Sequence, residues 1–380
     1  MALEMDRDRD CILCGKCLEA CPLFKATGRE ELSPRGKSFL IQEALEERNL
    51  GNPAAARKLL GLCLGCGRCA DVCPQGRNLP ETLRRIKAGH PGWQAWVWRA
   101  WINNAKHVWP WLGGCAKLLP GRSTAGSLPS VVHALASRPQ MEMFRRSAGD
   151  GFLPSPAVLF PGCMARYAKP WWIQAAGRIM GSAGQGLEDF PDWNCCGFTL
   201  GQAGLSGLRS DACVKNVELW RNLGRPLLLT ICATCTTALR NYEKKADLFS
   251  DEDERRTWAK AVQPLSRYLN PHDFRPLTDA CLTYHRPCHA PNPDPDEAFL
   301  RDLFGPRFIA GAQGACCGMG GVMRLSAPEL STQVATQCWD ALQPQALGHV
   351  VSGCSGCVLQ LSATAPPKTD VSHWLELMRM

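Results

Sequence analysis

The grouping of its cysteines constrains this chain more than any other feature of the sequence. Eighteen of the 22 cysteines fall into short, regularly spaced groups, and four stand apart: Cys115, Cys213, Cys281 and Cys338. Regular groups are typical of metal sites, whereas 22 cysteines among 380 residues are too sparse for a small disulfide scaffold. We expect the grouped cysteines to bind metal and the other four to be small buried hydrophobic residues.

Two groups near the N-terminus share the spacing C-x-x-C-x-x-C-x-x-x-C-P. Bacterial ferredoxins use this run to hold [4Fe–4S] cubane clusters, and the fourth cysteine of each run binds the other cluster. Paired zinc knuckles are the alternative, but zinc sites separate two C-x-x-C units by a longer loop. The spacing therefore predicts two crossed ligand sets, one of Cys11, Cys14, Cys17 and Cys73, the other of Cys63, Cys66, Cys69 and Cys21.

The remaining ten grouped cysteines follow a different pattern, Cys…Cys-Cys-Gly…Cys-x-x-Cys, which occurs twice. Five thiolates are one more than a cubane uses, and an adjacent cysteine pair can place two sulfurs on neighbouring irons. We therefore expect two further, non-cubane [4Fe–4S] clusters. Their predicted ligands are Cys163, Cys195, Cys196, Cys232 and Cys235 in the first set, and Cys288, Cys316, Cys317, Cys354 and Cys357 in the second.

The segments around these ten cysteines also repeat. Strands are expected at 157–160, 227–231, 281–285 and 349–352, each followed by a cysteine or ending at one, and a helix is expected at 329–342. This order predicts a pseudo-twofold α/β domain behind an α-helical ferredoxin domain that contains a helical stretch at 33–60. The expected divisions are a two-cluster ferredoxin-type domain (1–90), a Trp-rich helix and linker (91–155) and two repeats (156–275 and 276–380).

Residues 92–112 are rich in tryptophan and suggest an amphipathic surface helix, which Pro110 is expected to end. Trp and cationic residues suit docking at a membrane interface. The alternative is that the apolar face packs on the protein's own domains or on a membrane subunit. On a helical wheel the apolar face holds Val97, Trp98, Trp101, Ile102, Ala105, Val108 and Trp109, opposite Arg99, Asn103, Lys106 and His107.

Charge and hydropathy limit which cellular compartment and which partners we expect for this chain. The formal net charge of +8 does not predict nucleic-acid binding, because each four-thiolate cluster carries about −2 and no basic stripe is interleaved with aromatic residues. The charged N-terminus leaves no room for an apolar signal region, and no run reaches the roughly 20 apolar residues that span a bilayer. We expect a cytoplasmic protein, either free or peripheral on the inner face of the cytoplasmic membrane.

The sequence shows no obvious motif for a site that transfers hydride. No glycine-rich nucleotide loop and no Ser/His/Asp pattern is evident, so a partner would have to oxidise a substrate. His285 and His289 lie close to Cys288 and are the candidate catalytic residues, since an imidazole there could supply protons as the cluster takes electrons. The alternative is that they cap a helix or bind backbone carbonyls.

The repeated Cys…Cys-Cys-Gly…Cys-x-x-Cys motif resembles the cysteine-rich CCG domain of heterodisulfide reductase, and its fusion to a two-cluster module is similar to that enzyme's D subunit. The chain also resembles the iron–sulfur subunit of glycolate oxidase or lactate dehydrogenase, and the C subunit of anaerobic glycerol-3-phosphate dehydrogenase. The segments 33–37 (SPRGK) and 371–377 (VSHWLEL) favour the glycolate oxidase branch. Both C-x-x-C units are complete, however, as in heterodisulfide reductase.

This resemblance implies an iron–sulfur electron-transfer subunit of a multi-subunit dehydrogenase for glycolate, lactate or glycerol 3-phosphate. It also implies an FAD-containing partner subunit, with electrons passing toward quinone, directly or through a membrane subunit. The alternative that the resemblance leaves open is a catalytic thiol/disulfide oxidoreductase like heterodisulfide reductase, in which the C-terminal clusters form the active site.

Overall fold

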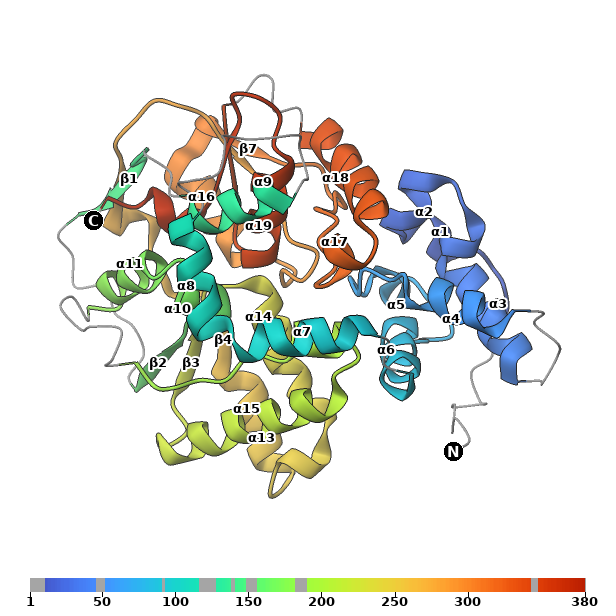
Figure 1. Cartoon of the computed structure of the whole chain (residues 1–380). Coiled ribbons are helices and arrows are strands. Elements are labelled where there is room, and N and C mark those ends of the chain that lie inside the picture. The colour runs from blue at the N-terminus through green and yellow to red at the C-terminus, as the bar shows by residue number, and fades with distance from the viewer. Residues whose placement is uncertain are drawn as a thin grey trace.

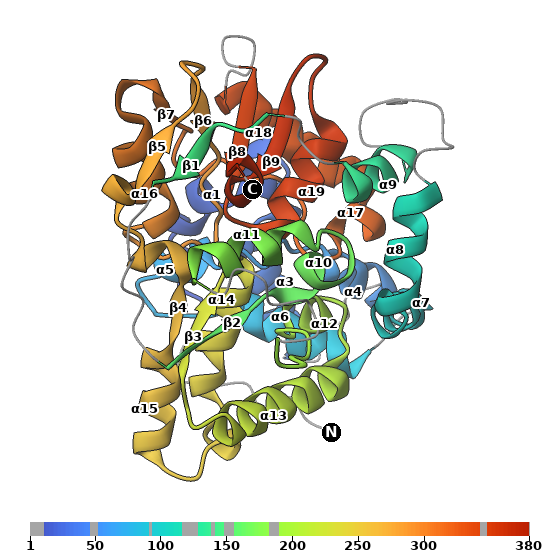
Figure 2. The ribbon, with the colours of Figure 1, turned by 90° about the vertical axis from the view of Figure 1, so that its left-hand side faces the viewer.

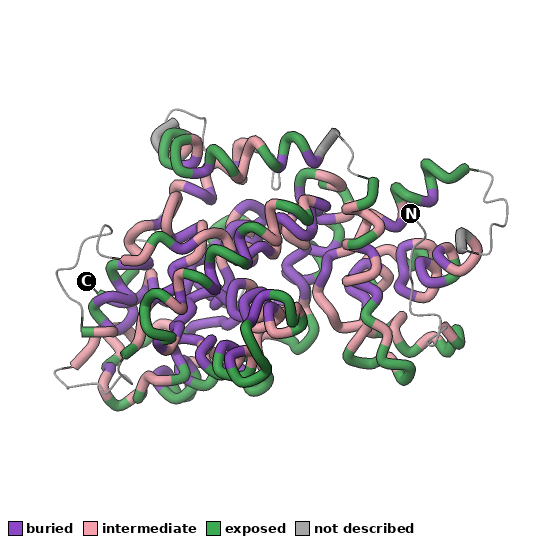
Figure 3. Tube along the Cα trace, turned by 90° about the horizontal axis from the view of Figure 1, so that it is seen from below, coloured by how far each residue is buried: buried purple, intermediate pink, exposed green. Residues whose placement is uncertain are grey.

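The computed structural model describes residues 11–45, 52–90, 93–115, 128–137, 141–147, 156–181, 190–342 and 348–379. A helical N-terminal module lies beside a larger α/β body, and helices α7 (Trp93–Asn103) and α8 (Ala105–Cys115) run along that body (Figure 1). Buried residues concentrate inside the body (Figure 3). The predicted fold class, a helical ferredoxin domain followed by a pseudo-twofold α/β domain, is confirmed.

The N-terminal module consists of short helices that begin at caps readable in the sequence. Asn52 and Asn78 each accept a hydrogen bond from a first-turn backbone N–H, and a proline follows within the first turn of each helix. The single helical stretch expected at 33–60 is two helices, and residues 46–51 lie outside the described residues. The elements are α1 (Lys16–Ala20), α2 (Pro22–Thr27), η2 (Glu30–Leu32), α3 (Pro34–Leu45), α4 (Pro53–Gly61), α5 (Arg68–Asp71) and α6 (Leu79–Gly89).

The first repeat is built on a parallel sheet of strand order β2-β3-β4. β2 and β3 confirm the two strands expected there, whereas β4 was not predicted. Helices cover this sheet. The elements are β2 (Ala157–Phe160), α10 (Gly162–Tyr167), α11 (Trp171–Ile179), α12 (Phe198–Gln202), α13 (Ser206–Asn222), β3 (Leu227–Thr230), α14 (Ala233–Arg240), α15 (Glu252–Ala261) and β4 (Val262–Pro264).

The second repeat has a parallel sheet of order β7-β6-β8-β9. Its β6-β8-β9 part has the same order as β2-β3-β4, and β4 and β9 each lead into a short 3-10 helix, so both repeats share one topology. The elements are β6 (Leu282–Tyr284), α16 (Pro295–Phe304), β7 (Phe308–Ala310), α17 (Met323–Ser326), α18 (Pro328–Leu342), β8 (His349–Ser352), α19 (Ser355–Thr364), β9 (Asp370–His373) and η11 (Trp374–Leu377).

One hydrophobic core joins the two repeats. Leu229 of β3, Tyr284 of β6 and Val351 of β8 belong to a single buried cluster, which also takes in Trp109 of α8. A short antiparallel pair, β1 (Phe144–Arg146) with β5 (Phe274–Pro276), ties the linker to the segment between the repeats. The repeats therefore form one packed body rather than two separate units.

The Trp-rich segment differs from the expected docking helix. It forms two helices, and Pro110 lies inside α8 instead of ending the helix. Trp98 and Trp109 are only 7% and 8% exposed, so most of the predicted apolar face packs inward, as the alternative interpretation held, but Val97 is 39% exposed and does not belong to it. Among the side chains that the structure describes in this segment, Trp96 and Trp111 are the exposed tryptophans. With α9 (Leu128–Ala136), these helices cover one side of the α/β body (Figure 2).

Membrane-spanning helices were searched for in the part of the chain that the structure describes. None of the helices there combines the length and the apolar character that crossing a bilayer requires.

Candidate iron–sulfur sites

The structure brings Cys21 together with the second ferredoxin-type run. Cys21, Cys63, Cys66 and Cys69 line one small cavity of about 30 Å³. Helices α1 and α5, one from each run, pack against each other. This arrangement is the one that a crossed ligand set requires, and it supports the proposed assignment of Cys21 to the cluster of Cys63.

The side chains around this cavity favour a metal-bound form. Burial raises the pKa of the Cys66 thiol to about 12, so a thiolate there needs a metal to stabilise it. Lys37, only 2% exposed, lines the same cavity and donates to the carbonyl of Leu32. Burial lowers the pKa of Lys37, and the neighbouring thiolates oppose that effect. An ammonium group in this position would offset part of the negative charge of a cluster.

The ten cysteines of the two C-terminal sets all line one cavity of about 550 Å³. Two of them, Cys232 and Cys354, are the N-cap residues of α14 and α19. Each follows a parallel strand and precedes a helix, so the C-x-x-C units lie where helix N-termini present unpaired N–H groups. That environment stabilises thiolates and the anionic clusters they would bind.

The glycine of each Cys-Cys-Gly motif is required by its conformation. Gly197 and Gly318 both have positive φ, 82° and 83°, where a side chain is strained. A Cβ on Gly318 would also lie 2.5 Å from the carbonyl oxygen of Ser331. The tight turn lets the backbone N–H of Gly197 donate to the sulfur of Cys195 at 3.4 Å. The turn therefore places the adjacent cysteines in the cavity wall and supplies a donor to one of them.

The two sets show the same pattern of thiol interactions. The hydrogen bond with Cys163 lowers the pKa of Cys195, and the one with Cys288 lowers the pKa of Cys316. In each Cys-Cys pair the first cysteine is thus more acidic than the second. The equivalence holds for these pairs only, because the hydrogen bond with Cys232 also lowers the pKa of Cys354 in the second set, whereas the pKa of Cys232 itself is not lowered.

The two sets meet across the repeats. The sulfur of Cys232 lies 3.2 Å from the hydroxyl of Ser355 and accepts a bond from its backbone N–H at 3.4 Å. Reciprocally, the hydroxyl of Thr234 lies 3.1 Å from the sulfur of Cys354. Each C-x-x-C unit therefore gives a hydroxyl to a cysteine of the other repeat.

Arg68 connects the ferredoxin module to the second repeat. Its guanidinium donates to the carbonyls of Gly314 and Ala315, the latter at 3.3 Å, just before the Cys316-Cys317 pair. Burial disfavours the charge, but the thiolates of Cys316 and Cys288 outweigh burial and raise the pKa of Arg68. Arg68 thus stays cationic between two sets of cysteines.

The Cys63–Cys66 loop fits closely into the α/β body. A Cβ on Gly65, which has φ +66°, would lie 2.0 Å from the amide nitrogen of Gln202, so only glycine allows this approach. On the other side, Leu64 comes within 3.0 Å of a Cβ position on Gly320. The second ferredoxin-type set and the C-terminal sets therefore lie next to each other.

The two candidate histidines occupy different places. His289 lines the large cavity, where its Nε2–H donates to the carbonyl of Gly65 at 3.2 Å and its Nδ1 lies 3.1 Å from the hydroxyl of Thr234. Burial lowers the pKa of His289. His285 is buried outside the cavity lining, 3.2 Å from the hydroxyl of Ser352. His289 therefore binds a backbone carbonyl, as the alternative interpretation held, and a proton-donating role stays a proposal.

The cysteines outside the regular groups, which were expected to be buried, differ in exposure. Cys213 and Cys338 are fully buried, as expected. Cys281 is exposed, which makes that expectation wrong: it precedes β6 at the surface end of the strand. The side chain of Cys115 lies outside the described residues.

The donor set fits iron–sulfur clusters, since it consists of many thiolates surrounded by backbone N–H donors and helix N-termini. Among the described residues, no group of three or more His, Cys, Asp or Glu side chains is spaced to hold a single metal ion. Sequence reasoning missed Arg68, Lys37, Thr234 and Ser355. Lys37 lies in the SPRGK segment (33–37), but no local sequence pattern predicts the contacts of the other three residues.

The fold and these cysteine sets define a multi-cluster iron–sulfur protein. A family described as "4Fe-4S dicluster domain" matches residues 8–77, and the "Cysteine-rich domain" CCG matches twice, at 157–240 and 282–362. The chain belongs to the CCG-domain iron–sulfur proteins, with a dicluster domain for two [4Fe–4S] clusters and two CCG domains.

Relatives match nearly the whole chain. The glycolate oxidase iron-sulfur subunit of Escherichia coli (strain K12) is 24% identical, over 99% of this chain and 95% of the relative. The B subunit of fumarate reductase (CoM/CoB) from Methanothermobacter marburgensis is 24% identical over 98% and 72%. The D subunit of dihydromethanophenazine:CoB–CoM heterodisulfide reductase from Methanosarcina acetivorans is 25% identical over 93% and 88%. All three names are those of oxidoreductase subunits.

Proposed function

We propose that this chain is the iron–sulfur electron-transfer subunit of a multi-subunit dehydrogenase that oxidises glycolate, lactate or glycerol 3-phosphate. An FAD-containing partner oxidises the substrate, and the electrons leave this chain toward quinone. Bound clusters supply one-electron redox chemistry at each cysteine set. The chain's own residues hold the clusters, exclude water and set the charge around them.

The succession of cysteine sets carries this proposal. Arg68 lies between Cys66 of the ferredoxin module and Cys316 of the second repeat, and Cys232 of the first repeat lies against Ser355 of the second. In this proposal, such a series carries electrons between the ferredoxin module and the C-terminal sites. The similarity to a protein named glycolate oxidase iron-sulfur subunit, over nearly the full length of both chains, supports the dehydrogenase context.

A second candidate function is reduction of a disulfide by the C-terminal sites themselves. Two complete five-cysteine sets line a single cavity, so two one-electron donors could serve one substrate there. The similarity to a heterodisulfide reductase subunit supports this alternative. We rank it second because much of the cavity lining is apolar, including Trp98, Trp101 and Trp109.

Anaerobic reduction assays test the proposal. Cluster-loaded protein should be bleached by dithionite but not by glycolate, lactate or glycerol 3-phosphate until the co-purifying flavoprotein is added. Iron and sulfide analysis should give four clusters, two of them spectroscopically unlike cubanes. Bleaching by a hydroxy acid with this chain alone would overturn the subunit proposal. Reoxidation by a thiol-coenzyme heterodisulfide, but not by a quinone, would favour the second candidate.

A further inference from the structure

The large cavity extends well beyond its cysteines. Helices α7, α8 and α9 form its other end with apolar side chains, Trp98, Trp101, Ile102, Trp109, Val131 and Leu135. These helices lie within 93–115 and 128–136, outside the segments that match the dicluster and CCG domains. We call this part of the cavity the tryptophan end. Clusters would occupy the cysteine end, which leaves the tryptophan end for another molecule.

The tryptophan end is shaped by aromatic rings that the fold holds in place. Trp101 and Trp109 lie with their ring centroids 5.6 Å apart, and Trp109 meets Tyr167 edge to face at 6.3 Å. Trp98 is buried against Ala203 and Val322. Flat, apolar walls of this kind favour a planar, apolar ligand over a flexible, charged one.

Two indole N–H groups of the cavity lining lack acceptors. Trp109 and Trp193 both line the cavity and are 8% and 4% exposed, yet neither Nε1 has a hydrogen-bond partner among the described residues. Buried donors are nearly always paired, so an unpaired donor that faces a cavity is available to an acceptor on a ligand. A ligand with hydrogen-bond-accepting oxygens would satisfy these two groups.

The charged side chains of the lining are mixed in sign, since Asp211 and Lys215 are both exposed and Asp192 accompanies Arg166, so they do not select an anionic ligand. Arg166 already pairs with Asp192 at 2.5 Å and donates to the carbonyl of Trp193 at 3.3 Å. Arg324 donates to the hydroxyl of Thr332 at 3.0 Å. The apolar rings and the indole donors therefore decide the character of the tryptophan end.

We propose that the tryptophan end binds the ring of a quinone, with one carbonyl oxygen accepting from the indole N–H of Trp109. The indole N–H of Trp193, which lies just before Cys195 and faces the same cavity from the cysteine end, is the proposed donor to the other oxygen. This inference rests on the proposed function, since it locates where electrons leave the chain. The quinone takes two electrons from the reduced iron–sulfur sites and two protons from water, and it departs as the quinol. The cysteine end and the tryptophan end share one cavity, so no further carrier is needed.

The test uses the cluster-loaded full chain and decylubiquinone, a short-tailed quinone. Its dissociation constant for the oxidised protein is measured by calorimetry, and its reaction with dithionite-reduced protein is followed by stopped-flow absorbance. Trp109→Phe and Trp193→Phe each remove one N–H and keep an aromatic ring. We expect each to weaken quinone binding about tenfold, the usual effect of losing one hydrogen bond.

Trp172→Phe is the matched control. Trp172 is also a buried tryptophan whose Nε1 has no partner within the described residues, but it does not line the cavity. Its replacement should leave quinone binding within twofold of the original. Val131→Phe, which narrows the tryptophan end, should slow reoxidation by quinone but not by ferricyanide. Iron content and paramagnetic resonance spectra check that each variant keeps its clusters.

The outcomes separate this inference from the proposed function. If decylubiquinone reoxidises the protein and neither the two cavity variants nor Val131→Phe alters this, the quinone binds elsewhere and the inference is overturned while the proposed function stands. If decylubiquinone neither binds nor reoxidises the original protein, although ferricyanide does, the quinone route itself fails. Reoxidation by a disulfide, weakened by Val131→Phe, would assign the tryptophan end to a disulfide substrate and overturn the inference.

Discussion

The hydroxyl of Ser355 lies 3.2 Å from the sulfur of Cys232, a cysteine of the other repeat. The hydroxyl of Thr234 makes the equivalent approach to Cys354, at 3.1 Å. Hydrogen bonds to the sulfurs of a cluster stabilise its reduced, more negative form and raise its reduction potential. With clusters bound at the proposed ligands, each repeat would therefore tune the site of the other.

Ser355→Ala and Thr234→Val should therefore lower the reduction potentials of the C-terminal sites. Loss of a hydrogen bond of about 1 kcal/mol corresponds to about 40 mV for a one-electron couple. Potentiometric titration with paramagnetic resonance detection measures the shift. Thr257→Val is a suitable control, because the Thr257 hydroxyl only donates to the backbone carbonyl of Asp253 on the exposed side of α15. Equal potentials in all three variants would contradict this tuning.

The position of Arg68 leads to a prediction about electron transfer between the ferredoxin module and the C-terminal sites. Arg68→Gln removes a cation between Cys66 and Cys316 and weakens the two bonds to the 314–315 carbonyls. Electron transfer from the ferredoxin module to the C-terminal sites should slow about tenfold or more, with all clusters retained. Arg68→Lys should restore part of the rate, because it keeps the charge but loses the forked geometry.

The control for Arg68 is Arg85→Gln, since the Arg85 side chain is 72% exposed. Rates are measured by flash reduction of the ferredoxin clusters and observation of the slower, C-terminal spectral change. A rate that is insensitive to Arg68→Gln would show that the guanidinium only holds the loop in place.

The grouping of the cysteines and the two kinds of domain were readable from the sequence because cluster binding imposes local spacing, whereas the ligand sets stay predictions. The strands expected at 157–160 and 349–352, which precede Cys163 and Cys354, have the predicted bounds. The short strands β4 and β9 were missed, because three or four residues ended by a 3-10 turn carry too little periodic signal.

Contacts between distant segments could not be predicted. Arg68 and Gly314 are 246 positions apart, and Cys232 and Ser355 are 123 apart, so their meeting depends on how the domains pack. The orientation of α7 and α8 could not be predicted either. A helical wheel identifies an apolar face such as that of Trp98 and Trp109, but it cannot say whether protein or lipid covers it.

The crossed ligand assignment makes a selective prediction. Cys21→Ser should damage the cluster proposed for Cys63, Cys66 and Cys69, because Cys21 lines their cavity. Cys73→Ser should instead damage the cluster proposed for the first run. Resonance spectra of the two variants should show opposite losses. Loss of the cluster nearest in sequence in each case would mean that the assignment is uncrossed.

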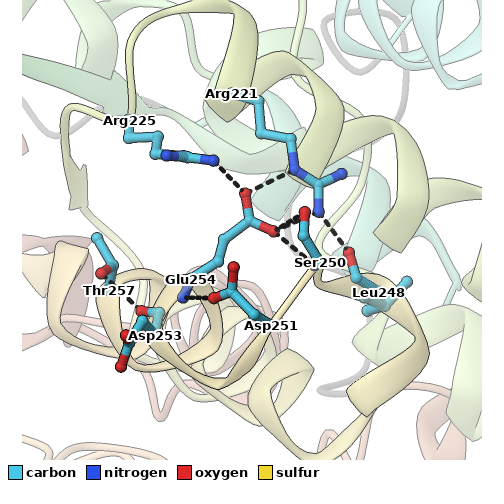
Figure 4. Close-up of polar contacts among 8 residues, drawn as sticks. All are labelled: Arg221, Arg225, Leu248, Ser250, Asp251, Asp253, Glu254 and Thr257. Carbon is cyan, nitrogen blue, oxygen red and sulfur yellow. Dashed lines mark hydrogen bonds and ion pairs between the residues drawn. The ribbon is translucent and has the colours of Figure 1, made fainter.

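Glu254 gives a prediction about pH. Its buried carboxylate accepts from Arg221 at 2.8 and 2.6 Å and from Arg225 at 2.8 Å, and it also accepts from the backbone and hydroxyl of Ser250 (Figure 4). These donors, Arg221 foremost, hold the pKa of Glu254 well below its usual range. Because the folded-state pKa is the lower one, the stabilisation is complete above the unfolded pKa of about 4.3 and is lost as the pH falls further.

Glu254→Gln should cost about 2 kcal/mol of stability at pH 7 and flatten the acid side of the stability profile. Chemical denaturation between pH 3 and pH 7, followed by circular dichroism, measures both effects. Glu252→Gln is the matched control on the same helix: its partners Arg255 and Arg256 lie at the surface, so little change is expected. Equal pH profiles for the two variants would contradict the role of Glu254.

Membrane docking, if it uses α7 and α8, depends on the side of these helices that faces outward. Trp96 and Trp111 are 73% and 69% exposed, and Lys106 and His107 are exposed near them in the sequence. Exposed tryptophan beside cationic residues is suited to the interface of an anionic bilayer, from which a quinone would reach the tryptophan end.

Trp96→Gln with Trp111→Gln should lower partition onto anionic vesicles at least tenfold without loss of clusters, as measured by co-sedimentation. Phe39→Gln, which changes an aromatic residue 47% exposed on the ferredoxin module, should partition like the original protein. Unchanged sedimentation of the double variant would mean that another protein, rather than lipid, covers this surface.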